Sequence, residues 1–409
     1  MKERLRAGIP DYILSLIDVL ANAHHRGYAV GGCVRDLLLG RVPDDFDMTA
    51  SAHPEALIEI FTGAGYKVIP TGLAHGTVTV LAEGHPVEIT THRTDGSYTD
   101  SRHPDAVTFT ESVEDDLARR DFTVNAMAYH PEIGLIDPFG GQRDLADGII
   151  RAVGEPCQRF GEDALRILRC FRFAAKLGFE IEEHTLQGTA ALAARLRDIA
   201  VERILAELCK LLEAPGAVRA LLAMDRAGVL PYVLPDTVPD RALIEALDAL
   251  PSEAELRLAA LLSRTGTAAA EALCRRLHAS NAFIKQVGGY LAALAAPLPT
   301  DAYTARRFLC HHFGQEEGGL ALHRALNGKD VAEALALVRQ VRRDRTAVEL
   351  RRLALNGREL QEQVGVPPAE TGKLLLYLQD QVWREPACNR RETLISLARQ
   401  YLQKENNRV

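Results

Sequence analysis

The first 150 residues alternate short apolar runs with turn residues, which is the pattern of β-strands interrupted by short helices. β-Branched and aromatic residues in short runs predict strands, and Gly and Pro separate them. The runs that predict strands are residues 28–30, 66–69, 77–81, 87–91 and 106–109. The runs that predict helices are residues 11–25, 34–39 and 54–62, the last with Ser51 as a cap and Pro54 in its first turn. This part of the chain is therefore expected to be a mixed α/β domain.

Beyond about residue 160 the strand pattern fades, and Leu, Ala and Ile recur at helical spacing. Gly and Pro fall in the gaps between the predicted helices. These helices are residues 162–177, 184–195, 200–213, 215–228, 240–249, 253–264, 268–278, 281–295 and 302–313. The segment Pro297-Leu298-Pro299 predicts a boundary between two helical parts. The pattern as a whole predicts an α+β chain, with a mixed sheet and helices first and helices alone afterwards.

Composition changes this picture little but excludes several classes of protein. The chain has 409 residues, of which 47% are hydrophobic and 25% charged, as in ordinary globular proteins. No apolar run approaches the roughly 18 residues of a membrane span, and the charged N-terminus has no apolar stretch behind it, so neither a membrane protein nor a signal peptide is expected. The seven cysteines are isolated and odd in number, which argues against a disulfide framework or a zinc site. A cytoplasmic protein is therefore expected, and the net charge of −7 weighs mildly against a nucleic-acid partner.

The first candidate site follows the strand predicted at residues 28–30. Gly31 and Gly32 form a turn into a helix, and glycine there allows close approach of a phosphate. Arg35 adds a forked donor. Asp45 and Asp47 follow, and on a strand their side chains would share one face and could hold one hard cation between them. The alternative is an acidic surface turn.

A third carboxylate stands in the run Val87-Glu88-Ile89. Strand alternation places Glu88 on the opposite face from its two apolar neighbours. If this strand pairs beside the strand of Asp47, Glu88 would reach the same cation. The alternative is a solvated outer face.

Two further motifs carry charged residues next to helical starts. Arg119 and Arg120 precede Asp121 and Asn125, and an arginine pair there suits triphosphate or ribose contacts, unless it is an exposed pair with Asp121 as a helix cap. A later helix is expected to carry its charges near one face. They are Asp163, Arg166, Arg169, Arg172 and Lys176. A carboxylate beside a guanidinium can pair with a base edge, and a solvated ladder of salt bridges is the alternative.

Together, these motifs resemble the tRNA nucleotidyltransferase family, the CCA-adding enzymes of the bacterial and eukaryotic type. The order GGxVRD, DxD, VExTTxR, RRDFTxNA, DPFGG, DxxxGxxR, EDxxR and ERIxxEL stands complete between residues 28 and 208. The segments 355–360, 365–368 and 372–375 are similar to the family's tail. The helices at about 210–300 match only in general character, as helical scaffold does.

The resemblance implies a fold and a division of the chain. A polymerase-β-like nucleotidyltransferase head would occupy residues 1–145, and a neck that recognises the base would occupy 146–212. A helical body would follow at 213–297, and a helical tail that binds tRNA at 298–409. Asp45 and Asp47 would bind catalytic Mg²⁺, with Glu88 as the third catalytic carboxylate.

The resemblance also implies which residues bind the nucleotide. Some would contact its phosphates, some its sugar and triphosphate, and some would read or support the base. In that order they are Gly32 and Arg35, then Arg120, Asp121 and Asn125, then Asp163, Arg166, Arg169 and Arg172.

The implied activity is template-independent addition of C, C and A to the 3′ end of tRNA from CTP and ATP, with release of pyrophosphate by two-metal nucleotidyl transfer. The implied partner is the acceptor arm of tRNA, with no membrane and no obligate protein partner. The alternatives are an A-adding enzyme of a split system, a bacterial poly(A) polymerase, and a non-catalytic RNA-binding protein. Residues 73–80 match the CCA-adding pattern better than the polymerase. The segment 93–116, with Tyr98, Arg102, His103 and Asp105, resembles the flexible loop that CC-adding members lack.

The negative net charge does not exclude RNA, because it averages over unequal parts of the chain. Acidic residues gather at the expected metal site, where cations neutralise them. Basic residues gather in the neck and again near the tail, and local patches suffice for phosphate contacts. The tail cluster is Arg339, Arg342, Arg343, Arg345, Arg351 and Arg352.

Overall fold

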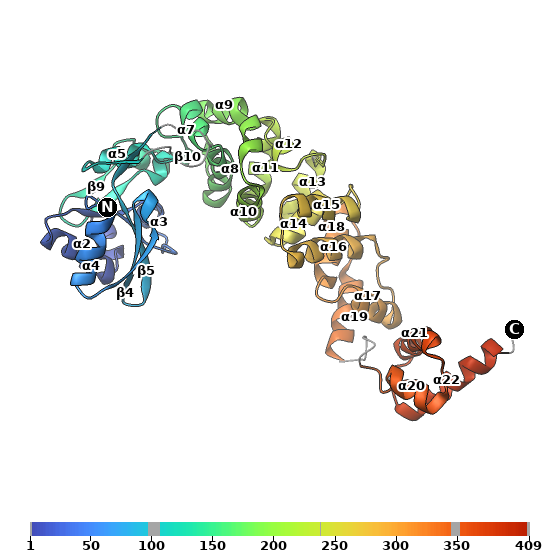
Figure 1. The fold of residues 1–409 in the computed structure, drawn as a ribbon. Coiled ribbons are helices and arrows are strands. Elements are labelled where there is room, and N and C mark those ends of the chain that lie inside the picture. The colour runs from blue at the N-terminus through green and yellow to red at the C-terminus, as the bar shows by residue number, and fades with distance from the viewer. Residues whose placement is uncertain (1, 97–106, 238, 345–351, 407–409) are drawn as a thin grey trace. The chain divides into compact units, whose positions relative to one another are not determined.

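The computed structural model describes residues 2–96, 107–237, 239–344 and 352–406, and the chain forms two compact units, residues 1–238 and 239–409 (Figure 1). The expected loop and basic cluster are only partly covered. Tyr98, Arg102, His103, Asp105, Arg345 and Arg351 lie outside the described residues.

The first unit is built on a seven-stranded mixed sheet with the strand order β3-β4-β5-β2-β1-β8-β9. Its strands are β1 (Gly27–Val30), β2 (Asp47–Ala50), β3 (Lys67–Gly72), β4 (Thr77–Ala82), β5 (His85–Thr91), β8 (Ala128–His130) and β9 (Gly134–Ile136). Strands β2 and β5 run parallel, and the other neighbouring pairs are antiparallel. The expected mixed sheet is confirmed.

Two smaller sheets each contain two strands. The run expected at residues 106–109 forms β7 (Val107–Phe109), which pairs with β6 (Arg93–Asp95) outside the main sheet. Strand β10 (Ile149–Ile150) pairs with β11 (Glu180–Ile181).

Helices cover both faces of the main sheet. The helices of the first unit are α1 (Lys2–Gly8), α2 (Asp11–Asn22), α3 (Gly32–Leu38), α4 (Pro54–Gly63), α5 (Val113–Ala118), α6 (Gly141–Asp147), α7 (Pro156–Glu162), α8 (Leu165–Leu177), α9 (Glu183–Leu192), α10 (Val201–Leu212), α11 (Ala217–Arg226) and α12 (Leu230–Val233). Helices α2 and α4 contact each other, and both pack on β4, α2 also on β1 and α4 also on β3. Helix α5 packs on the other face, where Val113 and Leu117 share a buried cluster with Tyr28 and Val30.

The expected cap of α4 is wrong. The residue before the helix is His53, and it makes no side-chain capping bond. Ser51 lies further back in the loop, where its Oγ accepts a hydrogen bond of 3.0 Å from the Arg26 backbone N–H.

The single helix expected at residues 162–177 is also wrong, because the chain breaks at Asp163. Helix α7 ends at Glu162, Asp163 is extended (φ −138°, ψ 104°), and α8 begins at Leu165. Asp163 Oδ1 accepts a hydrogen bond of 3.0 Å from the Leu165 N–H. Asp163 therefore does not share a helical face with Arg166, as the spacing had predicted. An Asp that bonds to the backbone ahead of it favours such a break, whereas apolar periodicity continues through it.

The described residues of the second unit are helical or irregular, as expected. The helices are α13 (Arg241–Glu245), α14 (Ala254–Leu261), α15 (Thr267–Arg276), α16 (Asn281–Ala295), α17 (Ala302–His311), α18 (Glu316–Asn327), α19 (Ala332–Arg343), α20 (Gly357–Val364), α21 (Pro368–Arg384) and α22 (Arg391–Asn406). None of the described helices in either unit is long and apolar enough to cross a membrane.

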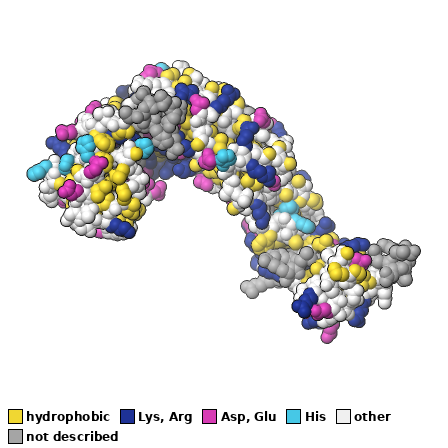
Figure 2. Space-filling model, viewed as in Figure 1, with side chains coloured by type: hydrophobic (Ala, Val, Ile, Leu, Met, Phe, Trp, Pro, Cys, Tyr) yellow, Lys and Arg dark blue, Asp and Glu magenta, His cyan; other side chains and the backbone are white. Residues whose placement is uncertain are grey.

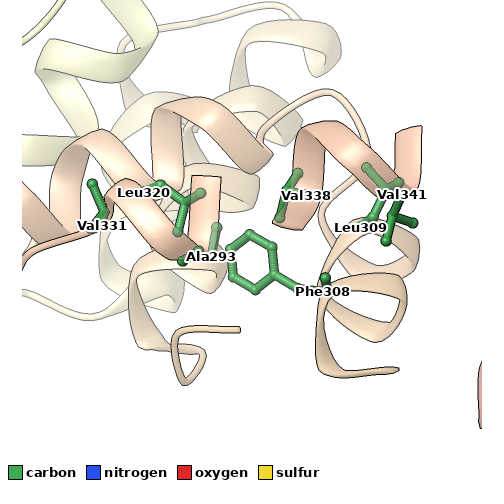
Figure 3. Close-up of a cluster of buried hydrophobic side chains, with 9 residues drawn as sticks. Ala293, Phe308, Leu309, Leu320, Val331, Val338 and Val341 are labelled. Atoms are coloured by element: carbon green, nitrogen blue, oxygen red, sulfur yellow. The ribbon is translucent and has the colours of Figure 1, made fainter. Parts of the chain in front are cut away.

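Two separate apolar cores lie among the described residues of this unit. The first joins α16, α17, α18 and α19, and Figure 3 shows the ring of Phe308 inside it. Its buried members are Ala293, Ala305, Phe308, Leu309, Leu320, Val331, Ala334, Val338 and Val341. The second core is built from Leu355, Leu360, Val366, Leu374, Leu378, Val382, Leu394 and Ala398.

The four-part division of the chain stays a prediction, but the packing qualifies two of its boundaries. The chain divides into its two compact units between residues 238 and 239, which lie inside the expected body. The expected boundary after residue 297 falls between Ala293 and Ala305, which belong to one core. The Pro297-Leu298-Pro299 segment is therefore a connection within packed helices.

The Phe308 ring is the largest group in the first of these cores, and 5% of the residue is exposed. We expect Phe308→Ala to lower the free energy of unfolding of the second unit by about 3–5 kcal/mol, because it removes buried apolar surface and leaves a cavity. Phe313, of which 51% is exposed, is the matched control, and Phe313→Ala should change that free energy by less than about 0.5 kcal/mol. Urea denaturation of the full chain measures both. Equal losses in the two variants would contradict the assignment of Phe308 to the core.

Candidate active site in the first unit

The turn between β1 and α3 needs glycine at its first position. Gly31 has φ +78°, and a Cβ there would lie 2.9 Å from Arg120 Nη1. Gly32 begins α3, where a Cβ would lie 3.6 Å from Arg35 Nη2. Gly31 therefore lets the Arg120 guanidinium approach the backbone closely, whereas a Cβ at Gly32 would make only an ordinary contact with Arg35.

The sheet register brings two of the expected carboxylates together. Met48 pairs with Ile89 in the parallel contact of β2 and β5, so the residues before them, Asp47 and Glu88, are neighbours on the other face. Met48 and Ile89 are buried, whereas Asp47 and Glu88 are exposed. Glu88 is therefore exposed, as on a solvated face, and it lies beside Asp47.

Asp45 completes the group from the loop before β2. Strand β2 begins at Asp47, so Asp45 is not on that strand, contrary to expectation. Although water reaches Asp47, the crowding of protein atoms around it raises its pKa to about 6, helped by the negative charges of Asp45 and Glu88 and opposed by Arg120. Three carboxylates and one guanidinium thus act on one another at this end of the sheet.

These carboxylates suit a cation that takes further ligands from elsewhere. Among the described residues, no group of three His, Cys, Asp or Glu side chains could hold a metal ion by itself. The donors at Asp45 and Asp47 are oxygen atoms, which hard divalent cations prefer, and such ions commonly keep waters and substrate phosphates as their other ligands. The residues present therefore fit an ion that binds together with a phosphate.

A buried thiol ties the glycine turn to this group. Cys33 Sγ lies 3.4 Å from the Val30 carbonyl oxygen and 3.9 Å from that of Asp47, so its single S–H has two acceptors within reach. Burial raises the pKa of Cys33 to about 12, with a further increase from the charge of Asp47. Cys33 is thus an uncharged donor beside the first residue of β2.

A chain of buried polar contacts runs from α3 to α8. Arg35 donates from Nε and Nη2 to Asp36 at 2.8 Å and from Nη1 to Asn125 Oδ1 at 2.7 Å. Asn125 Nδ2 donates to Asp121 Oδ1 at 3.2 Å, and Arg169 donates to Asp121 Oδ2 at 2.7–2.8 Å. Burial would raise the pKa of Asp121, but the Arg169 charge and hydrogen bond hold it at about 2.

Three of the residues expected to contact the phosphates and the sugar, Arg35, Asp121 and Asn125, already bind other groups of the protein. The three guanidinium nitrogens of Arg35 are already bonded within the protein, and Asp121 and Asn125 bond to each other. Asp121 also accepts from the Phe122 N–H at 2.9 Å, ahead of a 3₁₀ turn at Thr123–Asn125. The alternative of an exposed basic pair is wrong for Arg120, which is half-buried between Gly31 and Asp47.

The two expected base readers are held by different partners. Asp163 Oδ2 accepts from Arg203 Nη2 at 2.9 Å, across from α10. Arg166 donates to Glu162 at 2.6 Å and to the Arg119 carbonyl oxygen at 2.9 Å. The Arg166 backbone N–H donates to the Asp163 carbonyl oxygen at 3.0 Å, but the two side chains bind different partners.

The remaining arginines of α8 surround one aromatic ring. The guanidinium carbons of Arg35, Arg169 and Arg172 lie 5.5, 5.3 and 4.0 Å from the centre of the Phe173 ring. Arg172 also pairs with Glu207 of α10. The alternative of a solvated salt-bridge ladder is wrong for Arg169 and Arg172, because their partners come from other elements.

Sequence reasoning assigned no role to four residues that hold this site: Asp116, Phe173, Arg203 and Glu207. Arg203 and Glu207 stand in the ERIxxEL motif, which marks them without saying what they contact. Asp116 is fully buried and pairs with Arg119 and Arg120. Its spacing from Val113 and Leu117 places it on the apolar side of α5, and that was the signal available in the sequence.

Comparison with known proteins was consistent along the whole chain. Family models match as the poly(A) polymerase head domain at residues 27–151, as the RNA and SrmB binding site of polymerase A at 178–240, and as tRNA nucleotidyltransferase domain 2 at 250–398. A CCA-adding enzyme of Geobacillus thermodenitrificans is 36% identical over 378 residues, covering 91% of each chain. One from Lactiplantibacillus plantarum is 33% identical over 410 residues, covering 96% of each.

Solved structures give the same relationship. A Bacillus stearothermophilus CCA-adding enzyme in complex with CTP superimposes with a TM-score of 0.85 at 32% identity, covering 98% of this chain and 99% of that one. A Thermotoga maritima CCA-adding enzyme complexed with tRNA has a TM-score of 0.71 at 22% identity and covers 98% of each chain, which shows a shared fold.

The crowding of carboxylates predicts that an active-site substitution stabilises the protein. Because the folded state raises the pKa of Asp47, its ionised form opposes folding above about pH 6, and this effect disappears below about pH 4, where the carboxyl is protonated in both states. Without divalent cations, Asp47→Asn should raise the free energy of unfolding at pH 7.5, on the order of 1 kcal/mol after solvent screening.

The gain should shrink as the pH falls from 6 to 4. Asp44→Asn, at an exposed neighbouring aspartate, is the control and should show no such gain. Urea denaturation in EDTA at several pH values measures both variants. A gain that is independent of pH would contradict the charge repulsion.

Proposed function

The chain belongs to the family of CCA-adding enzymes, and from that premise we propose that it adds C, C and A to the 3′ end of tRNA. The nucleotides come from CTP and ATP, and pyrophosphate leaves. Its head is polymerase-β-like, and its helical parts follow in the order of its relatives. The observation that supports the chemistry best is the register of β2 and β5, which sets Asp47 beside Glu88 within reach of Asp45 and Arg120.

Enzymes of this family use a divalent metal ion, and we propose that here the ion is Mg²⁺ held by Asp45 and Asp47. A bound ion would stabilise the charge on the attacking oxygen and on the departing pyrophosphate. Glu88 supplies a third negative charge on the same face of the sheet. Cys33 Sγ lies 3.9 Å from the backbone carbonyl oxygen of Asp47, and this contact supports the first residue of β2.

The protein's own groups orient the triphosphate and the sugar. Arg120 lies between the Gly31 turn and the carboxylates, so its charge faces the place where phosphate oxygens would lie. Gly32 lets the chain approach a phosphate closely, and Arg35 holds the α3 end of this turn against Asn125. We assign the sugar to Asp121 and Asn125, which the network around Arg169 fixes in one orientation. Such preorganisation favours an in-line attack by the 3′ hydroxyl.

The base is read by α8 and the break before it. Cytosine and adenine both present an exocyclic amine beside a ring acceptor, which a carboxylate and a guanidinium can recognise. We assign this role to Asp163 and Arg166, supported by Arg169 and Arg172. Selection of C and A by protein groups needs no nucleic-acid template.

The acceptor arm of tRNA is the proposed partner, and the second unit is proposed to bind it. Figure 2 shows basic side chains on both units, interspersed with acidic ones. In the expected basic cluster, Arg339 pairs with Glu317 at 2.7 Å and Arg342 with Glu316 at 2.9 Å. These two arginines would offer RNA their remaining donors or exchange partners. A cytoplasmic location stays a prediction.

Transcripts of tRNA that lack the terminal CCA test the function. With CTP and ATP together we expect extension by three nucleotides followed by a stop, and with CTP alone extension by two. Long A-tails would indicate a poly(A) polymerase, and extension only of transcripts that already end in CC would indicate an A-adding enzyme. No extension would indicate an RNA-binding protein without this activity.

The metal assignment is tested by Asp45→Ala. We expect nucleotide addition to fall by at least roughly a thousandfold, because the transition-state charge loses its cation. Binding of tRNA, measured by filter retention, should change little, since the carboxylate does not contact the RNA backbone. Asp44→Ala is the control at an exposed neighbouring carboxylate and should retain activity. Full activity of Asp45→Ala with Mg²⁺ would refute the assignment.

A further inference from the structure

Asp116 is a buried carboxylate on α5 that touches neither the expected metal site nor the expected base site. None of its surface is exposed. Its Oδ1 accepts from Arg119 Nε at 2.9 Å and Nη2 at 2.7 Å, and its Oδ2 lies 3.5 Å from Arg120 Nη2. A buried charge of this kind is strongly unfavourable without such partners.

The sheet holds Asp116 in place from the other side. Thr49 Oγ1 lies 3.3 Å from its Oδ2 and 3.1 Å from the Thr90 carbonyl oxygen, so these two acceptors share its one proton. The Arg93 backbone N–H donates to Oδ1 of Asp116 at 3.4 Å. Thr49 lies two residues after Asp47 on β2, so it shares a sheet face with that carboxylate. The position of Asp116 is therefore set by the same strand that carries the metal site.

The two arginines held by Asp116 lead to opposite ends of the nucleotide site. Arg120 reaches Gly31, where a Cβ would meet its Nη1 at 2.9 Å, and its charge lowers the pKa of Asp47. The Arg119 side chain binds Asp116, and the backbone carbonyl oxygen of the same residue accepts the 2.9 Å hydrogen bond from Arg166. Asp116 thus binds Arg120, which lies at the triphosphate end of the site, and Arg119, whose backbone binds Arg166 at the base end.

We propose that Asp116 is a positioning residue that holds Arg119 and Arg120 and thereby sets the distance between the triphosphate contact and the base-reading Arg166. This inference rests on the proposed function. Asp116 does not contact the nucleotide. It acts through Arg119 and Arg120. A nucleotide whose triphosphate binds at Arg120 then has its base placed beside Arg166.

The variant Asp116→Asn keeps the size of the side chain and removes its charge and one acceptor. We expect the Kd for CTP, measured by calorimetry with Mg²⁺, and the KM for CTP and ATP to rise roughly tenfold to a hundredfold, because Arg120 loses its fixed orientation. The Kd for tRNA should change less than about twofold, since none of the groups involved is proposed to bind RNA. Asp115→Asn is the matched control: Asp115 is an exposed neighbour that accepts from Thr110 at 3.2 Å, and its loss should leave all these constants unchanged.

A double-mutant cycle separates positioning from general stability. If Asp116 acts through Arg120, the loss of CTP affinity in Asp116→Asn with Arg120→Gln will be smaller than the product of the two single losses. Losses that multiply would overturn the proposal. A second variant, Arg119→Lys, keeps the charge but cannot make both contacts to Oδ1, and a smaller rise in the same constants is expected.

The outcomes distinguish this inference from the proposed function. If the wild-type protein fails to extend tRNA, the proposed function is wrong. If it extends tRNA and Asp116→Asn binds CTP as the wild type does, the inference about Asp116 is wrong. If Asp116→Asn does not fold, unchanged constants in Arg119→Lys overturn the inference.

Discussion

Each buried charge at the centre of the first unit meets an opposite charge, and this requirement decides how the helices lie against the sheet. Asp121 meets Arg169 of α8, Arg172 of α8 meets Glu207 of α10, and Arg35 meets the neighbouring Asp36. Removing one partner of such a pair costs about 3–5 kcal/mol, because the other charge stays buried. The pairs Asp121–Arg169 and Arg172–Glu207 therefore link elements that are far apart in the sequence, whereas Arg35 and Asp36 are neighbours within α3. The ring of Phe173 fills the space that three guanidinium groups share.

The carboxylates beside this network are not fully neutralised, because negative charges outnumber the positive charge near them. In the main sheet of the described residues, the parallel pairing of β2 and β5 sets Asp47 and Glu88 side by side, and Asp45 adds a further negative charge. Arg120 offsets part of the repulsion, and burial, together with the repulsion that remains, raises the pKa of Asp47. A divalent cation together with a triphosphate would complete the neutralisation. If this is the proposed nucleotide site, it should be more stable with the cation and substrate bound than without them.

The sequence predicted the secondary structure better than the contacts that join its parts. Strand alternation located β1, β4 and β5 closely, because each has one clear apolar side or lies wholly in the core. The break at Asp163 escaped detection, because apolar periodicity runs through it while a side chain bonds to the backbone. The partners of Arg169 and Arg172 could not be predicted, since helical spacing describes neighbours on one helix and says nothing of α10 or Asp121. Asp116 could have been found as an acidic residue on an apolar face, although the arginines it holds could not.

The buried ion pairs of the first unit also limit the order in which parts of the chain can fold during synthesis on the ribosome. The apolar cores of the second unit join residues within about fifty positions of one another, so each can close soon after its own helices emerge. The polar network of the first unit cannot form as early, because its partners are far apart in the sequence. Arg35 binds Asn125, Asp121 binds Arg169, and Arg172 binds Glu207, and in each pair the second residue is synthesised later. A nascent chain that ends before residue 207 holds charged groups without their native partners. The N-terminal sheet, although synthesised first, reaches its final electrostatic state only after the helices that follow it have been made.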